Sequence, residues 1–177
     1  MFQQYFDRHT DADQDAEVRA QAEEIRLLDA LAEDHAEFAI FPSAENVTRA
    51  LAAWTWLDLT GLRPILVNSF GEIFFLKETS VVMLDALGGA IQPVAETLAA
   101  FVAMLEDPEV QDDLLVAGLV TALRDRGDYL GPDECYDYIE APILGGAFEL
   151  SNIEAVDFVA KHISAADIHR DLADTPA

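Results

Sequence analysis

Apolar and polar positions alternate most clearly between residues 64 and 89, where three short apolar runs are separated by breaks. The runs are Ile65–Asn68, Ile73–Leu76 and Val81–Leu84, and the breaks are Ser69-Phe70-Gly71 and Lys77–Ser80. Short runs of this kind, bounded by glycine and polar residues, are typical of strands joined by tight turns. They predict a three-stranded meander. Because the runs are so apolar, at least one face of the sheet must be covered by helices.

Five other segments predict those helices. Residues 17–35 and 43–59 have apolar positions at helical spacing, and Thr60-Gly61 ends the second of them. A third helix is expected with Pro93 in its first turn, and a fourth from Asp107-Pro108 to Gly127. Ser151 and Glu154 form a capping-box pattern, which predicts a last helix from this point through about Ile163.

The segment Cys135–Glu140 alternates again and predicts a further strand, paired with the meander. The predicted fold class is therefore α+β: a small, mainly antiparallel sheet made of the meander 65–85 and the strand 135–140, packed by four to five helices. Residues 1–36 are expected to form an acidic N-terminal helical extension, and residues 37–177 an α+β domain.

Charge changes what this fold can bind. The chain has 34 acidic and 10 basic residues and a net charge of −24, spread along its whole length. Such a field repels phosphate, so binding to nucleic acid or to an anionic membrane is not expected. It attracts a basic protein, of which a nucleic-acid-binding protein is one example. The alternative is an acidic surface that only keeps the protein soluble, as in halophilic proteins.

The chain has one cysteine, Cys135, which excludes an internal disulfide and favours a buried structural thiol. Neither a secretory signal nor an apolar run of about 20 residues is present. We expect a cytoplasmic protein.

Candidate catalytic and metal-binding residues are few. Asp133, Glu134, Asp137 and Glu140 crowd one segment, but the strand pattern favours a solvent-facing acidic edge over an acid–base pair. His162 and His169 are too widely spaced to favour a metal site, and their role stays open. No phosphate-binding loop, nucleophile elbow or dinucleotide fingerprint occurs, so we expect no enzyme, cofactor or metal.

From Trp54 onward the order of these pieces resembles a known family. The most specific segments are Glu134-Cys135-Tyr136, Pro142–Gly146, Asn152 and Asp167–Arg170. They resemble the C-terminal domain of type VI secretion immunity proteins, which neutralise an antibacterial DNase and in which this domain often follows a so-called GAD-like domain. The resemblance covers roughly residues 45–172. It implies an immunity-type fold and a cytoplasmic, non-catalytic protein that binds a secreted DNase toxin.

We therefore predict a partner-binding surface on the acidic residues and on one exposed anchor. The candidates are Asp133, Glu134, Asp137, Glu140, Glu149 and Trp56. The alternative function is a housekeeping or regulatory domain that has no toxin partner and acts as a homo-oligomer, such as a homodimer, or as a ligand-binding module.

Overall fold

The predicted meander is the centre of a five-stranded antiparallel sheet. The computed structural model describes the backbone of residues 2–174 and the side chains of residues 16–173. The strands are β1 (Ala39–Ile40), β2 (Leu62–Asn68), β3 (Ile73–Lys77), β4 (Ser80–Asp85) and β5 (Ala90–Ala95), and they lie in sequence order. Every neighbouring pair is antiparallel. The α+β class is confirmed.

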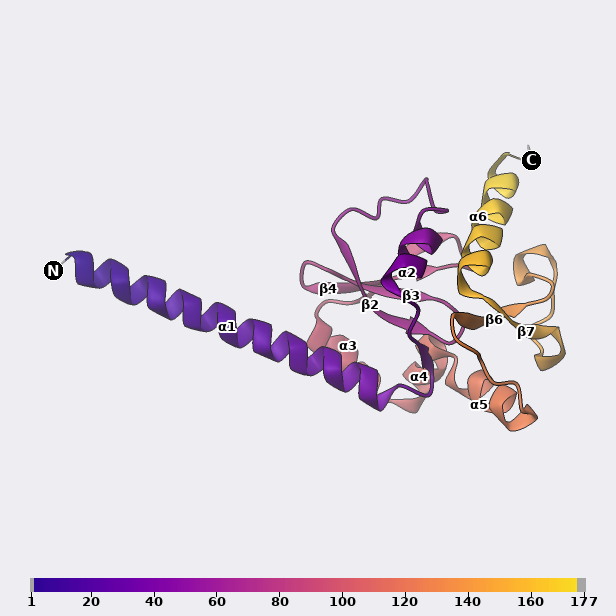
Figure 1. Cartoon of the computed structure of the whole chain (residues 1–177), viewed down its shortest axis with the longest axis horizontal. Helices are drawn as coiled ribbons and strands as arrows, with labels where there is room; N and C mark the ends of the chain where they lie inside the picture. Colours follow the sequence, from indigo (N-terminus) through magenta and orange to yellow (C-terminus); the bar gives the residue numbers. More distant parts are fainter. Residues whose placement is uncertain (1, 175–177) are drawn as a thin grey trace.

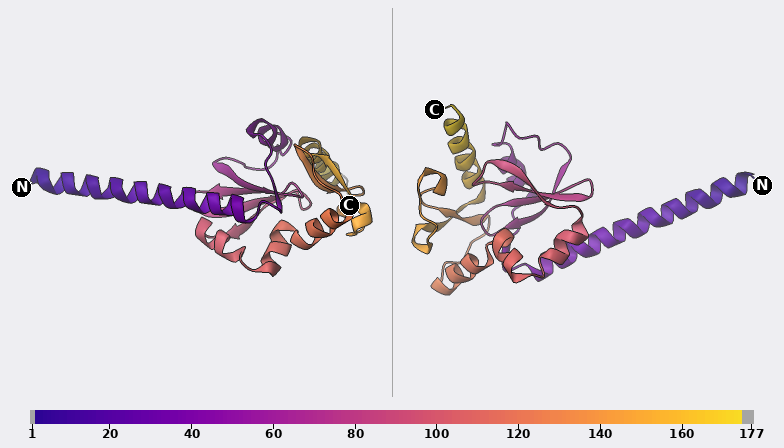
Figure 2. Two further views of the ribbon diagram at one scale, coloured as in Figure 1. Left: turned by 60° about the horizontal axis from the view of Figure 1, so that its bottom comes forward. Right: turned by 180° about the vertical axis from the view of Figure 1, so that it is seen from behind.

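Helices cover both faces of this sheet (Figures 1 and 2). They are α1 (Phe2–Asp34), α2 (Ala44–Leu51), α3 (Leu98–Met104), α4 (Pro108–Leu115), α5 (Ala117–Arg126) and α6 (Phe158–Asp174). In the left view of Figure 2 the sheet lies between α2 above and α3, α4 and α5 below. Most of α1 projects away from the rest of the molecule (Figure 1).

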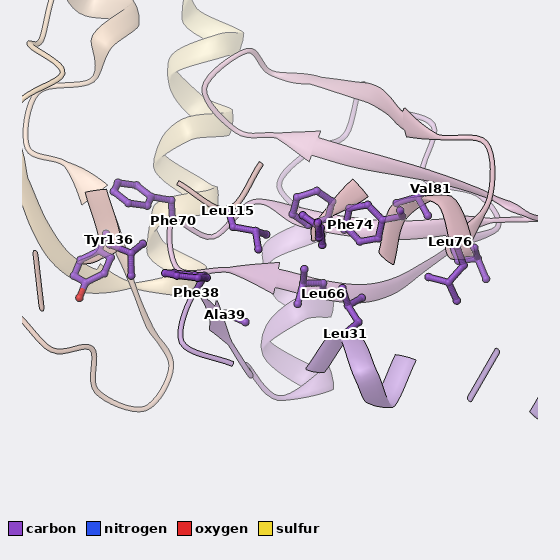
Figure 3. Packing of buried hydrophobic residues seen from close by; sticks show 14 of the residues in the cluster. Leu31, Phe38, Ala39, Leu66, Phe70, Phe74, Leu76, Val81, Leu115 and Tyr136 are labelled. Atoms are coloured by element: carbon purple, nitrogen blue, oxygen red, sulfur yellow. The ribbon is translucent and has the colours of Figure 1, made fainter. Parts of the chain in front are cut away.

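The central strand β3 explains why both faces are covered. Its successive side chains point to opposite faces, and Ile73 through Phe75 are fully buried. Phe74 packs in the core with α1, α3 and α5, whereas Ile73 and Phe75 pack in a second core with α2 and α6. In Figure 3, Leu31 of α1 lies beside Leu66 of β2 in the first of these cores.

The structure corrects the predicted place of the strand at residues 135–140. This strand is β6 (Glu134–Tyr138), and it pairs with β7 (Ile153–Asp157) in a separate two-stranded sheet. A backbone hydrogen bond of 2.8 Å from the Tyr136 amide to the Ser69 carbonyl connects β6 to the turn between β2 and β3. The segment that was predicted to start a helix at Ser151–Glu154 continues instead into β7. This strand supplies the backbone hydrogen-bond partners of β6, so β6 does not need to pair with the meander.

Five predicted helix boundaries were also wrong. The first helix begins at Phe2 and not near residue 17, and the second ends at Leu51 and not at residue 59. Pro93 lies in the edge strand β5, where a missing N–H is tolerated, and the next helix starts after the N-cap Thr97. The helix predicted from residue 107 to 127 is broken at Val116, which has a left-handed backbone. The last helix begins at Phe158, with the Asp157 carboxylate accepting from the Ala160 amide at 2.7 Å.

Candidate partner-binding surface

The connection between β6 and β7 carries the densest group of exposed apolar side chains. It contains two short 3₁₀ turns, η1 (Pro142–Leu144) and η2 (Leu150–Asn152). Ile139 is 61% exposed and Phe148 is 72% exposed, and Ile143 and Leu144 are also exposed. The Phe148 ring stands edge-on to Tyr138, with centroids 5.5 Å apart. Apolar exposure concentrated on one connection is a feature of binding surfaces.

Asn152 holds this connection in shape. Its side-chain amide donates to the Glu140 and Ala147 carbonyl oxygens, both at 2.9 Å, and its Oδ1 accepts from the Glu140 amide at 2.9 Å. A Cβ atom at Gly146 would collide with the Glu140 carbonyl, so a side chain at residue 146 would open the loop. The exposed apolar residues are thus presented on a preorganised loop, which lowers the ordering cost of binding.

Arg126, at the end of α5, fixes the return of the chain into β7. It donates to the Leu150 carbonyl at 2.7 Å and to the Ile153 carbonyl at 3.4 Å, and it pairs with Asp128. The two-stranded sheet and its loop are therefore tied to the helical layer under the main sheet as well as to α6.

A pocket of about 220 Å³ lies between the start of this loop and α6. Ile143 and Leu144 line its loop side, and Ala165 and Ile168 line its helix side. Small-molecule and cofactor sites usually have about 300–1,000 Å³. The pocket is below that range, and it is large enough for a side chain of a partner protein.

The buried Lys161 also lines this pocket. It is 4% exposed, and its Nζ atom lies 3.2 Å from the Asp137 carboxylate and 3.3 Å from the Tyr136 carbonyl oxygen. The ammonium is also 5.9 Å from the centre of the Phe70 ring. A buried cation needs such partners, because the cost of removing it from water is otherwise several kcal/mol.

Glu72 is a second buried ionisable side chain near Lys161. Its Oε2 accepts from the Ala86 amide at 2.9 Å. Burial raises the pKa of Glu72 to about 7, against the opposing effects of the Lys161 charge and the Ala86 hydrogen bond.

Burial also raises the pKa of Cys135 to about 12, and the predicted buried structural thiol is confirmed.

The two histidines have structural partners. His162 Nδ1 accepts from the Trp54 indole at 3.0 Å, so its proton is on Nε2, which donates to the Gly71 carbonyl at 2.9 Å. Burial, with the nearby Lys161 charge, lowers the pKa of His162 to about 4. His169 Nε2 lies 3.1 Å from the Ala86 carbonyl oxygen. In the described part of the chain, no three His, Cys, Asp or Glu side chains are placed to hold a metal ion.

The structure distributes the predicted partner-binding residues over several places. Asp137 and Glu140 line the pocket beside Lys161. Asp133 and Glu134 line another pocket, of about 330 Å³, near Tyr129. The two remaining candidates are Glu149, which is exposed just before η2, and Trp56, whose indole lies 3.4 Å from the Gly89 carbonyl oxygen and packs on Trp54.

Sequence reasoning missed the apolar part of the surface and the buried lysine. Ile139 falls in the predicted strand 135–140, and Phe148 lies where no helix or strand is predicted, so neither was read as part of a surface. The position of Lys161 gave a hint of its burial. It lies in the same helical turn as Val159 and His162, which are both buried. A charge beside such a buried run suggests a buried partner, here Asp137.

No helix among residues 2–174 is both long enough and apolar enough to cross a membrane.

Comparison with solved structures gave a weak similarity. The crystal structure of Atu4351 from Agrobacterium tumefaciens is 18% identical, with a TM-score of 0.39. The match covers 69% of this chain and 61% of that chain, so it spans about three fifths of the solved structure's length. No curated protein matches the sequence significantly.

Comparison with family models is more specific. Residues 95–165 match the model described as "T6SS immunity protein Tdi1, C-terminal". The match runs from the end of β5 into α6 and includes the whole β6–β7 unit with its loop and Lys161. This match confirms the resemblance to the type VI secretion immunity protein family.

Proposed function

We propose that this protein is an immunity protein that binds an antibacterial toxin and neutralises it without catalysis. The observation that carries the proposal is the position of the family match. Residues 95–165 contain the preorganised β6–β7 loop, its exposed apolar side chains and the pocket residues Asp137, Glu140 and Lys161. The segment that resembles immunity proteins is also the segment with the features of a docking surface.

We further propose that the toxin is a nuclease, and the charge of the protein supports this choice. Among the carboxylates whose side chains are described, Glu72 is the only buried one, and the others are at least partly exposed to solvent. A nuclease needs a basic cleft to hold phosphates. With its net charge of −24, this protein would be steered toward that cleft, and its rate of association with the nuclease would fall as the salt concentration rises. Binding would cover the cleft or hold the toxin in an inactive shape.

The proposed compartment is the cytoplasm, where a delivered nuclease would reach DNA. The proposed contact surface includes the sequence candidates Asp133, Glu134, Asp137, Glu140 and Glu149, with Trp56 as a more distant anchor. The helix α1 is proposed to be an extension of the domain and not part of this surface.

A DNA-cleavage assay tests the proposal. A nuclease toxin encoded beside this gene would be incubated with plasmid DNA and increasing amounts of the protein. We expect cleavage to stop near equimolar protein. Heat-denatured protein at the same concentration controls for DNA shielding by added polyanion. Undiminished cleavage together with no complex on a sizing column would contradict the proposal.

A second candidate function, self-association or ligand binding, is favoured by one observation. An apolar groove of about 600 Å³ runs between α2 and β2, and Phe41 at its edge is 69% exposed. Light scattering of the purified protein tests for self-association through this groove. A stable dimer that dissociates on Phe41→Ser would favour this candidate.

A further inference from the structure

We propose that the pocket between the β6–β7 loop and α6 receives one cationic side chain, arginine or lysine, of the partner protein. This inference rests on the proposed function and deepens it, because it names the place and chemistry of one anchor. The walls of the pocket are apolar at Ile143, Leu144 and Ile168, which suits the alkyl part of an arginine or lysine side chain.

The charges around the pocket select a cation. Glu140 and Asp137 line it together with Lys161. The Lys161 ammonium is already held by Asp137 and by the Tyr136 carbonyl. The Glu140 carboxylate is different, because no ion pair or hydrogen bond engages it among the described residues, although its backbone is fixed by Asn152. Of the two carboxylates that line the pocket, Glu140 is therefore the one available to pair with an incoming cation.

The size and the charge of the site argue against three other occupants. At about 220 Å³ the pocket is smaller than a usual cofactor site. An anion, such as a phosphate, would have to approach Glu140 to reach a lysine that is 96% covered and already neutralised. A second copy of the chain would bring another acidic surface to an acidic rim, which costs several kcal/mol for each like-charge contact.

The anchor combines features of a binding hot spot. A partner arginine would bury its stem between the loop and α6 and place its guanidinium at Glu140, and the exposed Ile139 and Phe148 would exclude water around it. Because Asn152 and the backbone at Gly146 already set the loop geometry, little ordering is needed on this side of the interface.

Glu140→Gln tests the inference, with Glu106→Gln as the matched control. Both substitutions remove one exposed negative charge, but Glu106 lies between α3 and α4 and outside the pocket. The probe is a catalytically inactive form of the toxin encoded beside the gene, and the readout is the dissociation constant by calorimetry. We expect Glu140→Gln to weaken binding by about tenfold or more, and Glu106→Gln by no more than about twofold.

Charge reversal identifies the partner side chain. Glu140→Arg should abolish binding, and replacing one toxin arginine or lysine by glutamate should restore it only with that variant. Equal, small effects of Glu140→Gln and Glu106→Gln, with tight binding by the unmodified protein, would overturn the pocket assignment and leave the proposed function intact. Absence of binding by the unmodified protein would overturn both.

Discussion

The side-chain amide of Asn152 donates to the Glu140 carbonyl at 2.9 Å, while the Glu140 amide donates back to Asn152 Oδ1 at 2.9 Å. This reciprocal pair closes the β6–β7 loop across 12 residues and fixes the backbone of Glu140, the pocket residue whose carboxylate has no cation of its own among the described residues. The loop is thus part of the fold and also the best-formed candidate for recognition.

Replacing Asn152 should therefore affect both stability and binding. Asn152→Ala removes three hydrogen bonds and leaves loop carbonyls without their donors, so we expect a loss of about 2–3 kcal/mol in the free energy of unfolding. Ser151→Ala is the control, because Ser151 makes only a 3.4 Å contact with exposed Glu149, and it should change stability by less than about 0.5 kcal/mol. Urea unfolding measures both, and equal effects would contradict the role given to Asn152.

The buried Glu72 predicts a stability that depends on pH. The pKa of Glu72 is about 7 in the folded protein against an ordinary value of 4.5, so the folded state holds its proton more tightly. Stability from this group is therefore full at low pH and is lost as pH rises from about 4.5 to 7. The loss is on the order of 3 kcal/mol.

Glu72→Gln keeps an oxygen for the Ala86 amide but does not titrate. The natural protein should lose stability between pH 5 and pH 8, and this variant should not. The unfolding free energy of the variant minus that of the natural protein should therefore be larger at pH 8 than at pH 5, as measured by urea unfolding at both values. A difference between the two proteins that is constant with pH would show that Glu72 ionises in the folded state as it does in the unfolded chain.

His162 predicts the opposite pH response. The pKa of His162 is about 4 in the folded protein against an ordinary value of 6.5, because burial disfavours the charged ring. The unfolded chain takes up the proton first, so stability from this group is lost as pH falls from about 6.5 to 4.

His162→Gln removes the titration and disturbs the Trp54 and Gly71 hydrogen bonds. We expect it to lower the unfolding free energy by about 1–3 kcal/mol at pH 7, with a smaller deficit at pH 4.5. Thermal unfolding followed by tryptophan fluorescence gives both values. A deficit that grows at pH 4.5 would contradict the buried neutral imidazole.

The junction of α1 with the domain predicts a sharp contrast along one helix. Leu31 is fully buried against the sheet, whereas Val18 of the same helix is exposed. Leu31→Ala should cost about 2–5 kcal/mol in unfolding free energy, and Val18→Ala less than about 0.5 kcal/mol. A comparable loss in both variants would mean that the projecting part of α1 packs on something in solution.

The meander was predictable from sequence because its two breaks and its apolar runs are local signals. Ile73–Leu76 could not show by itself that both of its faces are buried, since a continuous apolar run fits one covered face or two. The strand β5 was missed because Pro93 is read as a helix start, and only its place at the sheet edge makes a strand proline acceptable.

The candidate surface was only half visible in the sequence. Asp137 and Glu140 were found because carboxylates are conspicuous, but the pocket that they line depends on Lys161, which is 24 residues after Asp137. The capping-box pattern of Ser151 and Glu154 wrongly predicted a helix start. Asn152 between them bonds to Glu140 in the loop before it, and the chain continues into the strand β7. Contacts of this kind are set by tertiary structure, which no local pattern records.

Hydrogen exchange of the protein alone and in complex with its toxin tests the central claim most directly. We expect added protection of the backbone amides from Ile139 to Phe148 and in the α6 turns that face the pocket, with little change in α1 or α4. Protection confined to the α2–β2 groove or to α1, in a complex that still blocks DNA cleavage, would contradict it.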